Sequence, residues 1–260
     1  MSTEFCRVDH EGRLTIVTLN RPEVLNALHA EAHAELAKVF DDFAADPGQW
    51  VAIVTGAGDR AFSAGNDLKA TAAGSRKPWP ASGFAGLTQR SDLDKPVIAA
   101  VNGIAFGGGF EIALACDLIL AADTAVFALP EPKVGLAALA GGLHRLPREI
   151  GLKQALGMIL TGRRVGAAEG KALGFVNEVV PAAELMATAR RWAAEIMEAS
   201  PMSVRASKQA VTRGLAEPTL EEALKNQMAY PAVAAMFRSH DFKEGPQAFA
   251  QKRKPHWKGV

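Results

Sequence analysis

The segment from Pro96 to Glu131 constrains this chain most. It contains three glycines at 107–109, a glutamate two residues later at Glu111, and a second glutamate at its end, Glu131. The sequence between the two glutamates is apolar and is expected to be buried. A buried segment with an acidic side chain at each end and a glycine run at its head indicates an active site rather than a scaffold.

Short apolar strands and helices alternate along the first half of the chain. Alternating apolar and polar residues on both sides of 9–12 predict a hairpin over 5–19. Helical spacing predicts helices over 30–45 and 109–115, and short apolar runs predict buried strands over 51–55, 97–101, 118–121 and 126–128. Strands and helices at such short intervals predict an α/β core.

Beyond Gly141 the pattern is almost wholly helical, with one further strand predicted over 175–180. Helices are predicted over 186–199, 202–214, 219–236 and 241–252. Their apolar faces are wide for a terminal appendage, so we expect them to pack on a neighbouring subunit as well. The predicted division is a core with the active site over 1–190 and a helical oligomerisation region over 191–260.

Composition and charge exclude several classes of protein. The 260 residues are 48% hydrophobic, enough for a substantial core, and the net charge of +1 gives no reason to expect nucleic acid as a partner. The longest apolar region, 112–129, is broken by Asp117 and Asp123, so no membrane span is expected. Cys6 and Cys116 lie far apart, and no secretory signal is visible, so a cytoplasmic protein with free thiols is predicted.

Several common motifs are missing from the sequence. The G-x-G-x-x-G spacing fails because position 112 is isoleucine, and there is no P-loop, no G-x-S-x-G elbow and no cysteine or histidine cluster with metal spacing. His29, Glu31 and His33 form H-x-E-x-H rather than H-E-x-x-H, which is more typical of a wetted helix face. Neither a metal nor a separate cofactor is therefore predicted.

Two glycine-containing loops each precede a predicted helix. Glycine lets the backbone approach a ligand closely, and the first N–H groups of a helix have no partner within it. One loop is the glycine run at 107–109, and the other is the small-residue turn at 64–68. Two N–H groups from separate loops, aimed at one oxygen, would form an oxyanion hole. Taken alone, either loop is more typical of plain turn chemistry.

Long motifs in this chain resemble the enoyl-CoA hydratase/isomerase (crotonase) superfamily. They are FSAGNDLK, DKPVIAAVNGIAFGGGFE and FALPEPKVGL, and the resemblance extends from RPEVLNAL near the start to EGPQAFAQKRKPHWKG near the end. Several of these segments are most similar to the carnitinyl-CoA dehydratase branch. The resemblance implies a spiral of ββα turns, followed by helices that build trimers, often paired into hexamers.

The resemblance also implies roles for individual residues. The backbone N–H groups of Asn66 and Gly108 would form the oxyanion hole, and Glu111 and Glu131 would be the catalytic pair. Residues bordering the coenzyme A part of the substrate would be Ala64, Asp67, Leu68 and Lys69. Coenzyme A is thus part of an acyl-CoA substrate, not a separate cofactor.

Retention of both glutamates favours reversible hydration of a 2-enoyl-CoA. Water must lose a proton and the α-carbon must gain one while charge grows on the thioester oxygen. We assign the main acid/base role at the α-carbon to Glu131. Glu111 is expected to activate or receive the water. An isomerase that moves the double bond, and a non-catalytic CoA- or RNA-binding relative, are the alternatives.

The chain departs from the broad hydratase pattern at 137–145. The glycine turn survives there, but its residues are more apolar and end in His144-Arg145. A trimethylammonium group on the substrate would require aromatic faces or a carboxylate, and Trp79 and Phe84 could supply the faces. His144 is compatible with a pocket, a packing or a solvent role.

Overall fold

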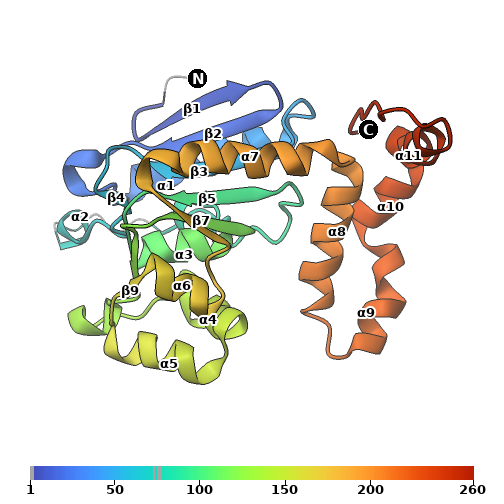
Figure 1. Ribbon diagram of the computed structural model, residues 1–260. Coiled ribbons are helices and arrows are strands. Elements are labelled where there is room, and N and C mark those ends of the chain that lie inside the picture. The colour runs from blue at the N-terminus through green and yellow to red at the C-terminus, as the bar shows by residue number, and fades with distance from the viewer. Residues whose placement is uncertain (1–2, 73, 75–77) are drawn as a thin grey trace.

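The computed structural model describes residues 3–72, 74 and 78–260, with two sheets at its centre (Figure 1). The larger sheet has the order β1-β2-β3-β5-β7-β10, and its pairs are parallel except β1–β2. Its strands are β1 Cys6–Glu11, β2 Leu14–Leu19, β3 Val51–Gly56, β5 Val97–Val101, β7 Leu118–Ala122 and β10 Glu178–Val180. The smaller sheet has the order β4-β6-β8-β9, with β4 Ala61–Ser63, β6 Ile104–Phe106, β8 Val126–Ala128 and β9 Val165–Gly166.

The middle of the chain repeatedly adds one strand to each sheet and then turns into a helix. β3 leads to β4 and α2 (Leu68–Ala72), and β5 leads to β6 and α3 (Gly108–Ala115). β7 leads to β8 and the 3-10 turn η3 (Glu131–Val134). β2, β3 and β5 are buried along their whole length; β5 is wholly apolar, whereas β2 and β3 also bury Thr15, Thr18 and Thr55. This repeated path confirms the predicted spiral of ββα turns.

Longer helices flank the two sheets. α7 packs against β3, β5 and β7 and lies across the larger sheet in Figure 1. Its inward residues, Leu185, Ala189 and Ala193, follow helical spacing and are buried. The helices beside the sheets are α1 Ala30–Ala45, α4 Gly142–Ile150, α5 Leu152–Thr161, α6 Ala167–Leu173 and α7 Leu185–Glu198.

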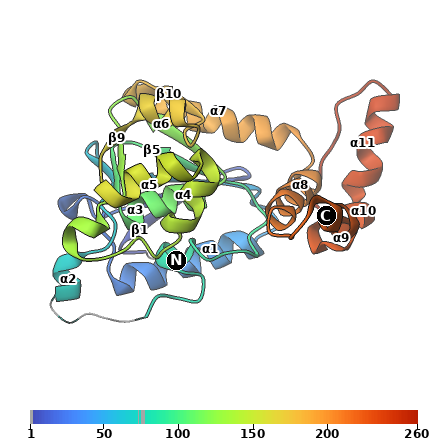
Figure 2. The ribbon, with the colours of Figure 1, turned by 90° about the horizontal axis from the view of Figure 1, so that it is seen from below.

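The last four helices stand apart from the sheets in both ribbon views (Figures 1 and 2). They are α8 Pro201–Gly214, α9 Leu220–Asn226, α10 Pro231–Arg238 and α11 His240–Ala250. A small apolar cluster of Ala206, Tyr230 and Val233 joins α8 to α10. The predicted boundary after residue 190 falls within α7, and the division into two regions stays a prediction.

The structure corrects three of the predicted element boundaries. The helix predicted over 219–236 is two helices, because Pro231 pushes Tyr230 out of helical conformation, to ψ 133°. The strand predicted over 175–180 begins only at Glu178. β1 continues through Glu11, so the hairpin turns at Gly12, where φ is +60°.

Asn26 joins three segments that are distant in sequence. Its buried side chain donates to the carbonyl oxygens of Ala57 (3.0 Å) and Ala61 (2.8 Å) and accepts from the Arg21 N–H (2.9 Å). Its carbonyl oxygen accepts from the Ser63 hydroxyl at 2.8 Å. The side chain thus holds the turn at 21–26 against the ends of β3 and β4, where the loop at 63–67 begins.

We predict that Asn26→Ala destabilises the fold by about 2–4 kcal/mol, because buried carbonyl oxygens lose their donors. Urea unfolding followed by circular dichroism measures the change. Asn226→Ala is the matched control, since its half-buried side chain donates to Glu217 (3.1 Å), and its loss is expected to cost under about 1 kcal/mol. Equal effects of the two substitutions would contradict the role assigned to Asn26.

Candidate active site

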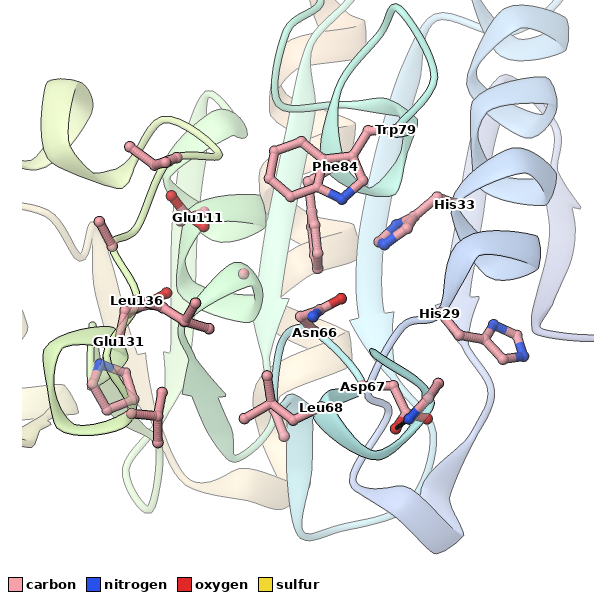
Figure 3. Close-up of a pocket in the computed structure, with 18 of the residues that line it drawn as sticks. His29, His33, Asn66, Asp67, Leu68, Trp79, Phe84, Glu111, Glu131 and Leu136 are labelled. Carbon is pink, nitrogen blue, oxygen red and sulfur yellow. Dashed lines mark hydrogen bonds between the residues drawn. The ribbon is translucent and has the colours of Figure 1, made fainter. Parts of the chain in front are cut away.

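One cavity of about 860 Å³ brings together most of the predicted site residues (Figure 3). Its lining includes seven of the eight, namely Ala64, Asn66, Asp67, Leu68, Gly108, Glu111 and Glu131. Lys69 is exposed on α2 and does not line this cavity. The lining comes from α1, the loop after β4, α2, the connection between α2 and β5, the start of α3, η3 and the turn that follows it.

The two glycine loops approach each other so closely that only glycine fits between them. A Cβ atom on Gly65 would lie 2.6 Å from the Phe106 carbonyl oxygen and 2.7 Å from the Gly108 nitrogen. Gly65 also has φ +87°, which favours glycine. A Cβ on Gly109 would overlap the Ser63 carbonyl oxygen. The loop at 63–66 therefore lies directly against the start of α3.

Backbone hydrogen bonds fix the first of these loops from the other side. The N–H of Leu28 donates to the Gly65 carbonyl (2.8 Å), and the N–H of Asp67 donates to the Leu28 carbonyl (2.9 Å). Asn66 is held between these two bonds, in a parallel bridge to Leu28. Gly108 is the first residue of α3, where N–H groups lack partners within the helix. The oxyanion hole formed by the N–H groups of Asn66 and Gly108 stays a prediction.

Glu111 lies on the first turn of α3 and is 3% exposed. The N–H of Gly142, at the start of α4, donates to its Oε1 at 2.8 Å. Burial raises the pKa of Glu111 to about 7; the Gly142 N–H opposes this rise, and the neighbouring Glu131 adds to it. A carboxyl group with this pKa can both take and give a proton at neutral pH.

Glu131 begins η3 and reaches back over the glycine run. A Cβ on Gly107, which has φ +53°, would lie 2.8 Å from its Oε1. Its Oε2 is buried and has no hydrogen-bond partner among the residues that the structure describes. Burial raises the pKa of this carboxyl as well. One oxygen of Glu131 is therefore available to a molecule in the cavity.

Asp67 contributes to the walls of the site rather than offering an open carboxylate. It lies 3.1 Å from the Arg21 guanidinium and accepts from the Ala70 N–H at 3.1 Å. It therefore ties the start of α2 to the turn at 21–26. Its role beside coenzyme A stays a prediction, as do those of Ala64, Leu68 and Lys69.

The cavity contains both aromatic candidates named from the sequence and a histidine that the sequence pattern assigned to solvent. Trp79 and Phe84 line the cavity, and the Phe84 ring packs directly on Gly108. His33 was predicted to lie on a wetted helix face, but it is 2% exposed and lines the same cavity. Its burial could have been predicted from its position on α1, because helical spacing places it on the same face as Leu36, Ala37 and Phe40, which are buried. His144 is exposed outside the cavity.

Comparison with known proteins agrees with this geometry. The family model described as enoyl-CoA hydratase/isomerase matches residues 9–260. A carnitinyl-CoA dehydratase of Escherichia coli K12 is 46% identical over 264 residues, covering 99% of each chain. A carnitinyl-CoA dehydratase of Proteus mirabilis is 46% identical over 255 residues, covering 95% of this chain and 96% of the relative.

Solved structures share the fold over the whole chain. An enoyl-CoA hydratase from Mycobacterium tuberculosis H37Rv has a TM-score of 0.92 at 38% identity and covers 98% of this chain and 99% of its own. A carnitinyl-CoA hydratase from Mycobacterium avium has a TM-score of 0.78 at 38% identity, with 100% of both chains covered. Among the described residues, no helix is long and apolar enough to cross a membrane.

The raised pKa of Glu111 predicts a pH-dependent cost of keeping this side chain buried. Between about pH 4.5 and 7 the folded protein holds a proton that the unfolded chain has released, so stability falls as pH rises. Glu111→Gln cannot ionise, so we expect it to be more stable than the wild type by roughly 3 kcal/mol at pH 8 and by about nothing at pH 4.

Chemical denaturation at the two pH values measures this difference. The control is Glu23→Gln, which removes an exposed carboxylate from the 3-10 turn Pro22–Val24. The control is expected to differ from the wild type by less than about 0.5 kcal/mol at either pH. A Glu111→Gln protein no more stable than the wild type at pH 8 would contradict a raised pKa.

Proposed function

The chain belongs to the enoyl-CoA hydratase/isomerase family, and we propose that Glu111 and Glu131 carry out its reversible hydration of a 2-enoyl-CoA thioester. The observation that carries this proposal is that both glutamates line one cavity together with the two glycine loops. The names of the relatives and structural neighbours support a hydro-lyase.

The thioester would bind with its carbonyl oxygen at the N–H groups of Asn66 and Gly108. Preorganised backbone donors stabilise the negative charge that grows on this oxygen without reorganising during the reaction. The close contact of Gly65 with Gly108 supports this placement, because it brings the two loops to one point. The coenzyme A part would then run along Ala64, Asp67, Leu68 and Lys69.

Water would add across the double bond with the two glutamates sharing one proton. As the water oxygen bonds to C3, its proton passes to Glu111 and the electron pair of the double bond moves toward the thioester oxygen. The enolate collapses as C2 takes a proton from Glu131, whose buried Oε2 supports this role. The reverse sequence eliminates water. Only water and protons move, so we propose that no separate cofactor takes part.

The helices of 191–260 are proposed to hold the chain in a homotrimer, or in a hexamer of two trimers. Support comes from the large apolar side chains that this region exposes, among them Val211, Leu215, Leu220, Leu224 and Phe249. Four of these side chains lie on α8, on α9 or in the turn between them, and such a group of exposed apolar side chains is typical of a subunit interface. We place the enzyme in the cytoplasm, on its two free thiols, Cys6 and Cys116.

The assembly proposal predicts that the double substitution Leu215→Glu/Leu220→Glu releases monomers. Light scattering after gel filtration should report about 27.5 kDa for this variant and a threefold or sixfold mass for the wild type. Leu152→Glu on α5, also exposed but outside the region, should leave the wild-type mass unchanged. A wild type that runs as a monomer would overturn the proposal.

For the catalytic pair we predict that Glu131→Gln and Glu111→Gln each lower kcat for hydration by roughly 10²–10⁴, because each removes a proton carrier. Loss of the ultraviolet absorbance of crotonyl-CoA and crotonobetainyl-CoA measures the rate. Glu149→Gln, on α4 outside the cavity, is the control and should keep wild-type kcat. Full activity of Glu131→Gln would contradict the mechanism, and turnover of a 3-enoyl-CoA faster than of its 2-enoyl isomer would favour an isomerase.

A further inference from the structure

The cavity contains one buried polar atom that the hydration mechanism does not use, Nε2 of His33. The Nδ1 atom of this ring accepts a hydrogen bond from the Ala85 N–H at 3.1 Å. Burial lowers the pKa of His33 to about 4, so the ring is neutral at physiological pH. Because Nδ1 accepts, the single proton of the neutral ring is assigned to Nε2.

This Nε2–H has no hydrogen-bond partner within 3–72, 74 and 78–260, the part of the chain that the structure describes. The ring extends from α1 toward Phe84 and Asn66 (Figure 3). A buried donor without a partner costs about 1–3 kcal/mol, and a ligand that supplies an acceptor recovers this cost. The histidine therefore favours a bound molecule that carries an acceptor at this point.

His33 belongs to a group of three rings at one end of the cavity. Its ring centroid lies 4.3 Å from that of Phe84 and 6.5 Å from that of Trp79. We call His33, Trp79 and Phe84 the aromatic wall. In Figure 3 the aromatic wall lies on one side of Asn66, and Asp67 and Leu68 lie on the other. With the thioester oxygen at Asn66 and coenzyme A toward Leu68, the acyl chain runs along the aromatic wall.

The charges around the cavity limit the kind of acceptor. Glu111 and Glu131 line it together with one lysine, Lys133, whereas Asp67 lines it in an ion pair with Arg21. An acyl chain ending in a carboxylate would be repelled by the charge that the two glutamates share. A trimethylammonium group would suit the aromatic wall and the carboxyl groups, but it offers no acceptor to the Nε2–H. An uncharged oxygen, as in a hydroxyl, ether or ketone, fits both constraints.

We propose that the preferred acyl group carries an uncharged oxygen beyond C3, and that the Nε2–H of His33 donates a hydrogen bond to it. This inference rests on the proposed function for the direction in which the substrate lies. It makes His33 a residue that determines acyl specificity without taking part in the proton transfers.

The test compares ligands of one shape that differ in a single oxygen. Hexanoyl-CoA has two ether isosteres, 3-ethoxypropanoyl-CoA and 4-methoxybutanoyl-CoA, with the oxygen at successive positions of the chain. All three are saturated, so calorimetry measures their binding whether or not the protein hydrates anything. Hydration of crotonyl-CoA is assayed separately, which keeps failure of the proposed function distinct from failure of this inference.

The variant is His33→Asn, whose Oδ1 can take the place of Nδ1 and accept from the Ala85 N–H while the distal donor is lost. We compare the Kd of hexanoyl-CoA with the Kd of whichever ether analogue binds more tightly. The ratio of these two values is expected to fall about tenfold from the wild type to His33→Asn. His33→Gln, which carries an amide N–H near the position of Nε2, should restore part of the ratio. His29→Asn is the matched control, since His29 lines the same cavity and caps α1, a role that asparagine also fills. The His29→Asn variant should have a ratio within about twofold of the wild-type ratio.

Two results would overturn the inference. Equal weakening of all three ligands in His33→Asn would show that His33 acts on the coenzyme A part or on the fold. An unchanged ratio with unchanged affinities would show that Nε2–H meets no ligand atom. A tenfold fall in the ratio supports the inference whether or not crotonyl-CoA is hydrated. A failure to hydrate crotonyl-CoA would count against the proposed function alone.

Discussion

The site depends on the close approach of two backbone segments, the loop at 63–66 and the start of α3. Gly65 and Gly109 lie where any side chain would collide with the backbone of the opposite segment. Hydrogen bonds of the turn at 25–28 hold the first segment, and α3 holds the second. Neither segment needs a bound ligand to keep its position, so the N–H donors proposed for the oxyanion hole would be preorganised when charge develops on the substrate.

Two buried carboxyl groups work against the stability of this arrangement. The N–H of Gly142 compensates Glu111 in part, whereas Oε2 of Glu131 has no partner within the described ranges. The protein therefore bears an electrostatic cost at the point where the proposed mechanism moves protons. The surrounding strands supply the stability that makes this cost tolerable, since β2, β3 and β5 are buried from end to end.

Sequence patterns predicted the strands of the larger sheet, the two glycine loops and the two glutamates, because apolar runs, glycines and an acidic residue at each end of a buried segment are local signals. The short strands β4, β6 and β9 were not predicted. They did not reveal the neighbours across the cavity. Phe84 packs on Gly108 and Gly142 donates to Glu111, and both contacts join segments more than twenty residues apart. His33 was misjudged because its polarity suggested solvent, whereas the helix face on which it lies is buried. The break before Pro231 was overlooked inside a long apolar pattern.

The proposed acyl end and the proposed reacting end of the cavity come from separate stretches of chain. Trp79 and Phe84 lie in the connection between α2 and β5, and His33 lies on α1, whereas the glutamates follow β6 and β8. Insertions or substitutions in the connection can therefore reshape the acyl end while leaving the spacing of the two carboxyl groups intact. Proteins with this fold can therefore differ in the acyl group that they bind while they keep the same pair of carboxyl groups.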